Sequence, residues 1–363
     1  MKNPDAVAAY RAPVLARLES FIKERRQKLP VGLAWQADIL ERLQDFAGGG
    51  KLLRGSLVCY SYAVCSDNAA GDGQANDLPT AVLDTAAALE LIHAGLLIHD
   101  DIIDQDDLRR GRPAMHRQYR DLAAIKGLPG AARLSENLAL CAGDMILFLA
   151  FELLATIQLR NDNGPALAEL FGRELMTVCA GQMQDIYLGA LDKPPAKRDI
   201  YAVMQAKTAA YSVALPLAAG AVLAGRPASI RQQLYNIGLA AGIMFQVRDD
   251  ELGALGRSSD IGKPVGSDIR EGKKTLLYYY LWKAAKPVER RRLATMFGNP
   301  DASPADIREV QQALRRHGVP ARLQADIQQL EQTAGRLITK LELNTPAKAE
   351  LRRLVRFCAA RKL

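Results

Sequence analysis

The sequence predicts an all-α protein. Alternation of apolar and polar residues with a period of two is nearly absent, whereas apolar residues recur every three or four positions along most of the chain. Glycine and proline divide this pattern into segments of helical length. At 363 residues and 49% hydrophobic content, the chain can bury a large core. We therefore expect an almost wholly helical fold.

The first part of the chain is predicted to form three helices separated by glycine and proline: residues 5–27, residues 33–47 and Leu53–Cys65. A polar loop, Ser66–Leu78, follows. Asp77 is expected to cap the next helix and Pro79 to lie in its first turn. This helix carries the acidic motif described below.

The later helices are predicted from the same apolar spacing. After an irregular stretch around Gly127–Gly130, we expect helices at Ser135–Arg160, Gly164–Leu188, Ile200–Ala224 and Ile230–Leu255. The chain should then form a charged loop at Gly262–Gly272, an apolar segment at Lys274–Ala285 and amphipathic helix within Ala305–Arg361. Nothing in the composition marks a linker between domains.

Composition and charge argue against several classes of partner. The most apolar stretch, Ala209–Ala224, contains Pro216 and falls short of the roughly 20 uninterrupted apolar residues of a membrane span. The N-terminus has no apolar signal core, so we expect a cytoplasmic protein without a membrane span. The net charge is +8, but the clearest basic cluster, Arg290–Arg292, lies on a polar segment, so no nucleic-acid partner is expected. The five cysteines form no CxxC pair and should be reduced.

The most informative stretch is Leu97–Pro113, which contains five carboxylates and three arginines, Arg109, Arg110 and Arg112. Asp100 and Asp104 should project from one helix face, one turn apart. Two such carboxylates repel unless a cation lies between them, and Mg²⁺ fits an oxygen-only site. The arginines offer planar donors for phosphate. The metal and the arginines would then bind the same anion.

The alternative explanation of this stretch is a solvated acidic face that ends in a basic turn. The preceding segment, Leu89–Ile98, is largely apolar, which favours a buried helix with a functional end. A second acidic pair, Asp249 and Asp250, also ends an apolar helix. Asp100, Asp104 and Asp249 could therefore hold a metal cluster bridged by a diphosphate.

These motifs resemble those of the trans-isoprenyl diphosphate synthases, the polyprenyl synthetase family, over nearly the whole chain. The matching motifs, in chain order, are GGK-x-x-R at Gly49–Arg54, the aspartate-rich motif with its arginine pair at Asp100–Gly111, GQMQD at Gly181–Asp185, Lys207-Thr208, FQVRDD at Phe245–Asp250 and GKPVGSDIREGKKT at Gly262–Thr275. The resemblance implies an isoprenoid-synthase-type helical bundle around a central deep cavity. It also implies a single domain over residues 1–363, usually assembled as a homodimer.

The resemblance further implies a Mg²⁺-dependent prenyltransferase, with three ions held by Asp100, Asp104 and Asp249. The catalytic residues it implies are Asp100, Asp104, Lys207, Gln246 and Asp249. An allylic diphosphate (dimethylallyl, geranyl or farnesyl) would be bound by Arg109, Lys207, Thr208, Gln246, Lys263 and Lys273. Isopentenyl diphosphate would be bound by Lys51, Arg54, His93 and Arg110.

Several of these residues also have a plain structural explanation. Alone, His93 would more often be a core histidine, and Lys51 and Arg54 could be surface charges at a helix start. Gln182 and Asp185 could be a buried polar pair, and we treat them as secondary candidates. The chain also departs from the family at three positions. Gly253 replaces a common third aspartate, Leu52 a common arginine and Gly55 a frequent proline, and the glycine is expected to loosen its turn.

Chain length is predicted from the two residues, Gly95 and Leu96, that lie five and four positions before Asp100. Bulky aromatic residues at these positions stop growth at C15 in the family, so the small pair favours geranylgeranyl diphosphate, C20. The floor of the cavity is then expected from deeper side chains, either Leu89 and Ile92 or Phe148 and Phe151. The alternatives are a longer (C25 or more) or C15 product, a terpene cyclase, and a non-catalytic subunit of a heteromeric synthase.

Overall fold

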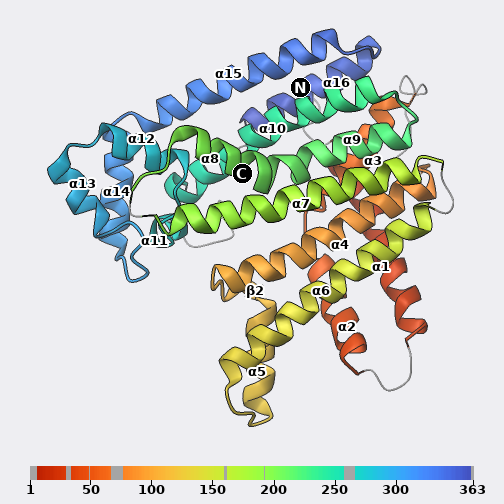
Figure 1. Ribbon diagram of the computed structural model, residues 1–363, viewed down its shortest axis with the longest axis horizontal. Coiled ribbons are helices and arrows are strands. Elements are labelled where there is room, and N and C mark those ends of the chain that lie inside the picture. Colours follow the sequence, from red (N-terminus) through yellow and green to blue (C-terminus); the bar gives the residue numbers. More distant parts are fainter. Residues whose placement is uncertain are drawn as a thin grey trace. The chain divides into compact units, whose positions relative to one another are not determined.

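The computed structural model describes residues 6–29, 34–48, 50–66, 77–158, 162–191, 193–256 and 266–360. In these ranges the protein is almost wholly helical, which confirms the predicted fold class (Figure 1). The exception within them is a two-stranded hairpin of β1 (Leu108–Arg109) and β2 (Arg112–Pro113). The chain forms two compact units. Unit 1 comprises residues 1–169 and 219–226, and unit 2 comprises residues 170–218 and 227–363.

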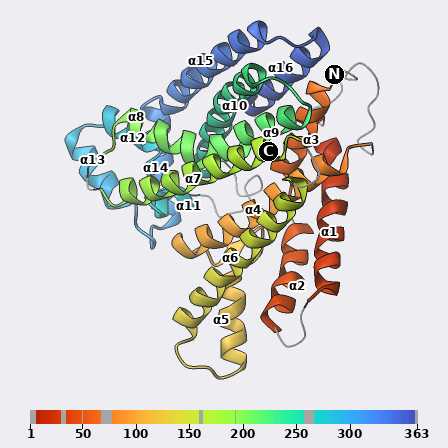
Figure 2. The same ribbon diagram turned by 45° about the vertical axis from the view of Figure 1, so that its right-hand side comes forward.

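Unit 1 is built around α4, a 24-residue helix. Its elements are η1 (Ala8–Tyr10), α1 (Arg11–Gln27), α2 (Ala34–Gly48), α3 (Leu53–Cys65), α4 (Thr80–Ile103), α5 (Met115–Ile125) and α6 (Ala131–Gln158). Figures 1 and 2 both show α4 beside α6, and α1 beside α2. The α4–α6 contact is close because both helices carry glycine there. A Cβ added at Gly95 would lie 3.0 Å from the carbonyl oxygen of Gly143.

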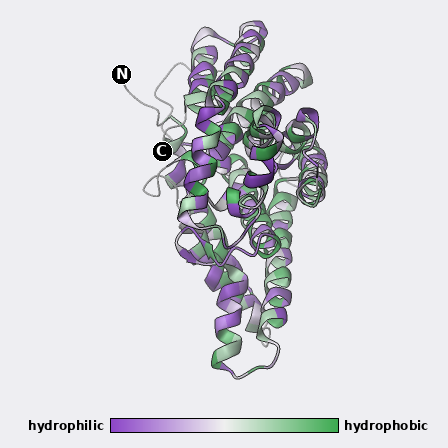
Figure 3. Ribbon diagram, turned by 90° about the vertical axis from the view of Figure 1, so that its left-hand side faces the viewer, coloured by the Kyte–Doolittle hydropathy of each residue, from purple (hydrophilic) through white to green (hydrophobic). Residues whose placement is uncertain are grey.

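Unit 2 contains the remaining helices, and α7 and α9 each run across the boundary between the units. Its elements are α7 (Gly164–Gly189), α8 (Lys197–Val203), η2 (Met204–Ala214), α9 (Leu215–Leu223), α10 (Ala228–Leu255), α11 (Ser267–Arg270), α12 (Leu276–Ala284), α13 (Pro287–Ala294), α14 (Pro304–Arg316), α15 (Val319–Lys340) and α16 (Thr345–Ala360). Figure 3 shows polar and apolar residues interleaved along the long helices, as expected for amphipathic elements.

The segment η2 is a π-helix, whereas the sequence predicted ordinary helix throughout Ile200–Ala224. Two glycines of α10 let this wider turn pack against its neighbour. A Cβ at Gly238 would lie 2.5 Å from the Cα of Ala214, and one at Gly242 would lie 2.6 Å from the Cα of Ala209. π-helical segments inside α-helices are frequent at functional sites, and η2, which is 11 residues long, carries Lys207 and Thr208.

Some predicted boundaries were wrong. The side chain of Asp77 does not cap α4. Pro79 is the N-cap residue, and its carbonyl accepts hydrogen bonds from the N–H groups of Val82 and Leu83. Helix α5 was missed, and α6 begins at Ala131 rather than at Ser135.

Within the part of the chain that the structure describes, three helical segments are long and apolar enough to cross a membrane by length and composition: Thr80–Ile103, Ala131–Ile157 and Lys197–Leu223. Their most apolar windows are 72%, 39% and 83% buried inside the fold, respectively. Packing inside a protein and insertion into a bilayer select the same apolar residues. The predicted absence of a membrane span is therefore not confirmed.

Candidate active site

The first aspartate-rich motif lies at the carboxyl end of α4. Asp100 is in the last turn, and the N–H of Asp104 donates to the carbonyl of Asp100 at 2.8 Å, so the two residues lie one turn apart, as predicted. Both are partly exposed. Their carboxylates are hard oxygen ligands of the kind that Mg²⁺ prefers.

The complete metal site remains a prediction. Asp100 and Asp104 belong to unit 1, whereas Asp249 belongs to unit 2. Among the residues that the structure describes, no group of three or more carboxylate, imidazole or thiol side chains is arranged to hold a metal ion.

Asp101 points into unit 1 and binds Arg109. Its side chain is fully buried, and Oδ1 accepts hydrogen bonds from Nε of Arg109 at 2.7 Å and from Nη2. Nη2 also donates to Asp106 at 3.2 Å. Burial raises the pKa of Asp101 to about 6, although the hydrogen bond from Arg109 acts in the opposite direction. Sequence reasoning missed Asp101. Its position could have indicated this role, because Asp101 lies about 100° around the helix from Asp100, on the buried side.

The hairpin directs the two adjacent arginines to different places. Arg110 and Gly111 form its turn, with φ values of 53° and 74°. A two-residue turn with both φ positive fits a tight hairpin. While Arg109 binds Asp101, Nη1 of Arg110 donates to the carbonyl of Phe46 at 3.3 Å. The two guanidinium groups therefore make different contacts within unit 1.

The described part of the GGK-x-x-R motif, residues 50–54, bends at Gly50 and leads into α3, which begins at Leu53. Leu52 is left-handed (φ 47°) and buried, so at this position the chain has an apolar wall where many relatives have an arginine. Lys51 is exposed and Arg54 is partly exposed. The expectation that Gly55 loosens this turn is wrong. A Cβ at Gly55 would lie 2.8 Å from the carbonyl oxygen of Ala86, so α3 packs directly on α4.

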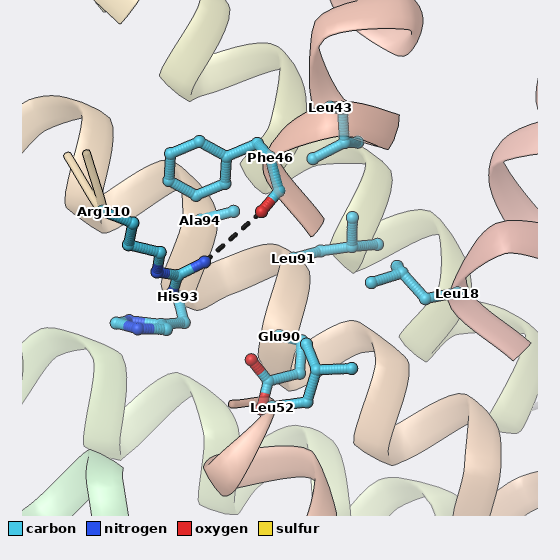
Figure 4. A pocket seen from close by; sticks show the side chains of 9 residues that line it. All are labelled: Leu18, Leu43, Phe46, Leu52, Glu90, Leu91, His93, Ala94 and Arg110. Atoms are coloured by element: carbon cyan, nitrogen blue, oxygen red, sulfur yellow. Dashed lines mark hydrogen bonds between the residues drawn. The ribbon is translucent and has the colours of Figure 1, made fainter. Parts of the chain in front are cut away.

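A pocket in unit 1 opens beside this turn. It is lined by Leu18, Leu43, Phe46, Leu52, Glu90, Leu91, His93, Ala94 and Arg110 (Figure 4). His93 is buried, and burial, followed by the charges of Arg54, Arg110 and Arg109, holds its pKa well below the usual value. His93 is therefore neutral at pH 7 and can donate a hydrogen bond. The structure thus brings His93 and Arg110, two of the predicted isopentenyl diphosphate ligands, into one pocket.

In unit 2, Lys207 forms an ion pair with Asp185. The distance from Lys207 Nζ to Asp185 Oδ2 is 2.7 Å. Asp185 comes from the GQMQD motif of α7, and the motif's glycine allows the close approach. A Cβ at Gly181 would lie 2.6 Å from the backbone nitrogen of Lys207. The pair supports Asp185 as more than a secondary candidate. Thr208 is partly exposed beside Lys207.

The two aspartates of the second pair differ in exposure. Asp249 is exposed, whereas Asp250 is buried and accepts a hydrogen bond from Nε2 of Gln246 at 2.6 Å. Burial, and then the charge of Asp268, raises the pKa of Asp250 well above its usual value. A Cβ at Gly253 would lie 2.6 Å from Oδ2 of Asp268. Asp268 thus supplies a carboxylate beside the position where many relatives have a third aspartate.

Of the two lysines predicted to bind diphosphate near this pair, Lys273 forms an ion pair with Glu271 at 2.8 Å. Lys263 lies outside the described residues, as does Gly49 of the first glycine motif.

The residues predicted to set chain length lie on α4 and α6. Leu89 and Ile92 are fully buried, so they remain candidates for a cavity floor. Phe148 and Phe151 are not supported, because they are 69% and 47% exposed. The small residue Gly95 does not leave open space beside α4. A Cβ at Gly95 would lie 2.8 Å from Cγ of Leu147, so Leu147 fills this position. Leu96 is partly exposed, and its role remains a prediction.

Comparison with known proteins shows the family to which the chain is similar. Residues 36–314 match the family model described as polyprenyl synthetase. The chain is 32% identical over 300 residues to the short chain isoprenyl diphosphate synthase of Methanocaldococcus jannaschii, covering 81% of this chain and 83% of that one. It is 32% identical over 264 residues to the geranylgeranyl diphosphate synthase of Sulfolobus acidocaldarius, covering 72% of each.

Among solved structures, the fold is similar to a geranylgeranyl pyrophosphate synthase from Corynebacterium glutamicum, complexed with isoprenyl diphosphate and magnesium. The TM-score is 0.88 at 31% identity, and the match covers 98% of this chain and 99% of that one.

Proposed function

Because the chain belongs to the polyprenyl synthetase family, we propose that it is a Mg²⁺-dependent trans-prenyltransferase that makes geranylgeranyl diphosphate from isopentenyl diphosphate and an allylic diphosphate. The observation that carries this proposal is a pair of candidate diphosphate sites along α4 of unit 1. An aspartate pair ends the helix, and a pocket lined by His93 and Arg110 lies about two turns before it. Head-to-tail condensation needs two diphosphates held separately, one with metal and one without.

The residues have distinct roles in this reaction. Arg109, oriented by Asp101, binds the allylic diphosphate together with Lys207, Thr208, Gln246, Lys263 and Lys273. Three Mg²⁺ at Asp100, Asp104 and Asp249 would neutralise charge on the departing diphosphate. The allylic C–O bond ionises, the double bond of isopentenyl diphosphate attacks the carbocation, and the released diphosphate takes the proton. Buried apolar side chains such as Ile92 exclude water from the cation.

Isopentenyl diphosphate is held without metal. Lys51, Arg54 and Arg110 supply the positive charge, because neutral His93 contributes a donor rather than a charge.

The direct test is incubation of the purified protein with farnesyl diphosphate, isopentenyl diphosphate and Mg²⁺, followed by chromatography of the product. A C20 product that disappears on chelation of the metal is expected. No extension of the primer, or a dominant product of C30 or more, would refute the C20 assignment. Relatives named geranylgeranyl diphosphate synthases support this length.

A terpene cyclase and a non-catalytic subunit are the competing proposals. A cyclase needs no second diphosphate site, and the two cations Arg54 and Arg110, which lie close enough to act on each other's charge, argue against it. A non-catalytic subunit usually lacks aspartates of the first motif, and both Asp100 and Asp104 are present. Turnover of isopentenyl diphosphate by the isolated protein excludes both.

Replacing Lys51 or Arg54 with alanine should raise the Michaelis constant for isopentenyl diphosphate by about 10-fold or more, the usual effect of losing one charged hydrogen bond. The constant for the allylic diphosphate should stay within about twofold, because that substrate is bound through other residues. Steady-state kinetics with each substrate varied in turn measures both constants. Equal changes in the two constants would contradict the separate subsites.

We also propose a homodimer, supported by the apolar side chains exposed on α6. Leu140, Phe148 and Phe151 are 43%, 69% and 47% exposed, at positions that share one helix face. Light scattering after size-exclusion chromatography should give the mass of a dimer for the native protein and of a monomer for Phe148→Asp. A native monomer would contradict the proposal.

A further inference from the structure

Glu90 is a buried carboxylate that the roles above do not use. It lies in the middle of α4, is 6% exposed, and has fully buried apolar residues, Leu89 and Leu91, on both sides. Burying a carboxylate costs free energy unless hydrogen bonds or opposite charges compensate. The position therefore calls for partners, and they come from the start of α3 and from the β-hairpin.

The first partner is the backbone of Gly55. Its N–H donates to Oε1 of Glu90 at 2.7 Å. Gly55 is in the first turn of α3, where N–H groups have no partner within the helix, and the N-cap residue Leu52 makes no side-chain cap. Glu90 thus caps α3 from another helix, and its negative charge suits the positive end of the α3 dipole.

Gly55 makes this contact possible. A Cβ there would lie 3.1 Å from Cγ of Glu90 and 2.8 Å from the carbonyl oxygen of Ala86. A larger residue would push α3 away from α4, and a proline would remove the N–H. The spacing between the two helices is therefore set where Glu90 reaches Gly55.

The second set of partners is Arg54 and Arg110. Burial raises the pKa of Glu90, and the hydrogen bond from Gly55, followed by the charges of these two arginines, acts in the opposite direction. Among the residues that line the pocket, Glu90 is the one carboxylate (Figure 4). It offsets the mutual repulsion of two cations that otherwise need a bound anion.

We propose that Glu90 is a positioning residue that holds the turn Lys51–Arg54 in its diphosphate-binding geometry, chiefly through the Gly55 N–H. This inference rests on the proposed function, because it assigns the turn to isopentenyl diphosphate. Glu90 acts through the turn and its cations, and it does not itself bind the diphosphate, since two anions would repel.

Two conservative variants separate the effect of side-chain length from the effect of charge. Glu90→Gln keeps an oxygen within reach of Gly55 but loses the charge. Glu90→Asp keeps the charge but is one methylene shorter, so the hydrogen bond is lost. Asp84→Asn is the matched control, because Asp84 is also a buried carboxylate of α4 but binds Arg17 of α1, at 2.5 Å.

The measurements are the Michaelis constants for both substrates, the dissociation constant for isopentenyl diphosphate from metal-free calorimetry, and hydrogen exchange of the Gly55 N–H. Glu90→Asp should weaken isopentenyl diphosphate binding by about 10-fold, as expected for a buried N–H left without an acceptor, and should speed Gly55 exchange. For Glu90→Gln and Asp84→Asn, the dissociation constant for isopentenyl diphosphate should stay within about threefold of the native value. The Michaelis constant for the allylic diphosphate should not change.

The proposal is overturned if Glu90→Asp weakens isopentenyl diphosphate binding by less than about fivefold. It is also overturned if the Michaelis constant for the allylic diphosphate rises by the same factor, or if Glu90→Gln weakens isopentenyl diphosphate binding as much as Glu90→Asp does. Calorimetry and exchange do not depend on turnover. A native protein that makes no prenyl product but shows the predicted binding and exchange differences would refute the proposed activity and leave the role of Glu90 standing.

Discussion

Replacing Asp104 with alanine is expected to lower turnover by about 10²-fold or more, the usual effect of removing one preorganised group that stabilises charge in the transition state. Asp100→Ala should behave alike, because the two carboxylates lie one turn apart at the end of α4. The fold should survive. Asp104 is the partly exposed C-cap residue, where a negative charge opposes the helix dipole, so its removal relieves repulsion.

The measurement is the initial rate at saturating substrates over a range of Mg²⁺ concentrations, with thermal melting as the check on folding. Asp107→Ala is the matched control. It lies in the same acidic run, but its side chain is 59% exposed and faces Arg117 at 3.7 Å. Near-native turnover with unchanged Mg²⁺ dependence in Asp104→Ala, or an equal loss in Asp107→Ala, would show that the metal ligands are elsewhere.

The fold class could be predicted because long helices bury continuous apolar stripes. Helix α4 ends at the predicted aspartates, and the predicted pair Asp249 and Asp250 lies in the last two turns of α10. Helix α5 was missed although its buried residues Met115, Tyr119 and His116 lie on one face. Polar residues such as Arg117 and Gln118 interrupt the pattern, and the helix is only 11 residues long. Packing, rather than sequence pattern, decides such short elements.

The site was predictable where a residue's role depends on its neighbours in sequence. The spacing of Asp100 and Asp104 is one example. Asp101 and Glu90 were missed because the role of a buried carboxylate becomes clear only when its hydrogen-bond partner is known. For Glu90 that partner is a backbone N–H 35 residues earlier in the chain. The π-helix around Lys207 depends in the same way on glycines of α10. Local sequence patterns do not contain such distant contacts.

The largest expected change in product chain length comes from moving a bulky side chain from α6 to α4. A small residue at position 95 favours a product longer than C15, so Gly95→Phe would be the simplest variant to block growth at C15. Since Leu147 and the carbonyl of Gly143 meet a Cβ at this position, the single variant should also overpack the helix contact. Overpacking typically costs about 1–3 kcal/mol, so a lower melting temperature is expected as well.

The double variant Gly95→Phe/Leu147→Ala moves the side chain from α6 to α4 and should restore stability. Leu147 is half-buried, so it can line the space that the growing chain enters. Because phenylalanine is larger than leucine, the double variant should stop at C15, whereas Leu147→Ala alone should extend the product beyond C20. Chromatography after incubation with geranyl diphosphate, isopentenyl diphosphate and Mg²⁺ distinguishes these outcomes. A folded double variant that still makes C20 would mean that the chain does not pass between Gly95 and Leu147, and the floor would then have to lie at Ile92 and Leu89.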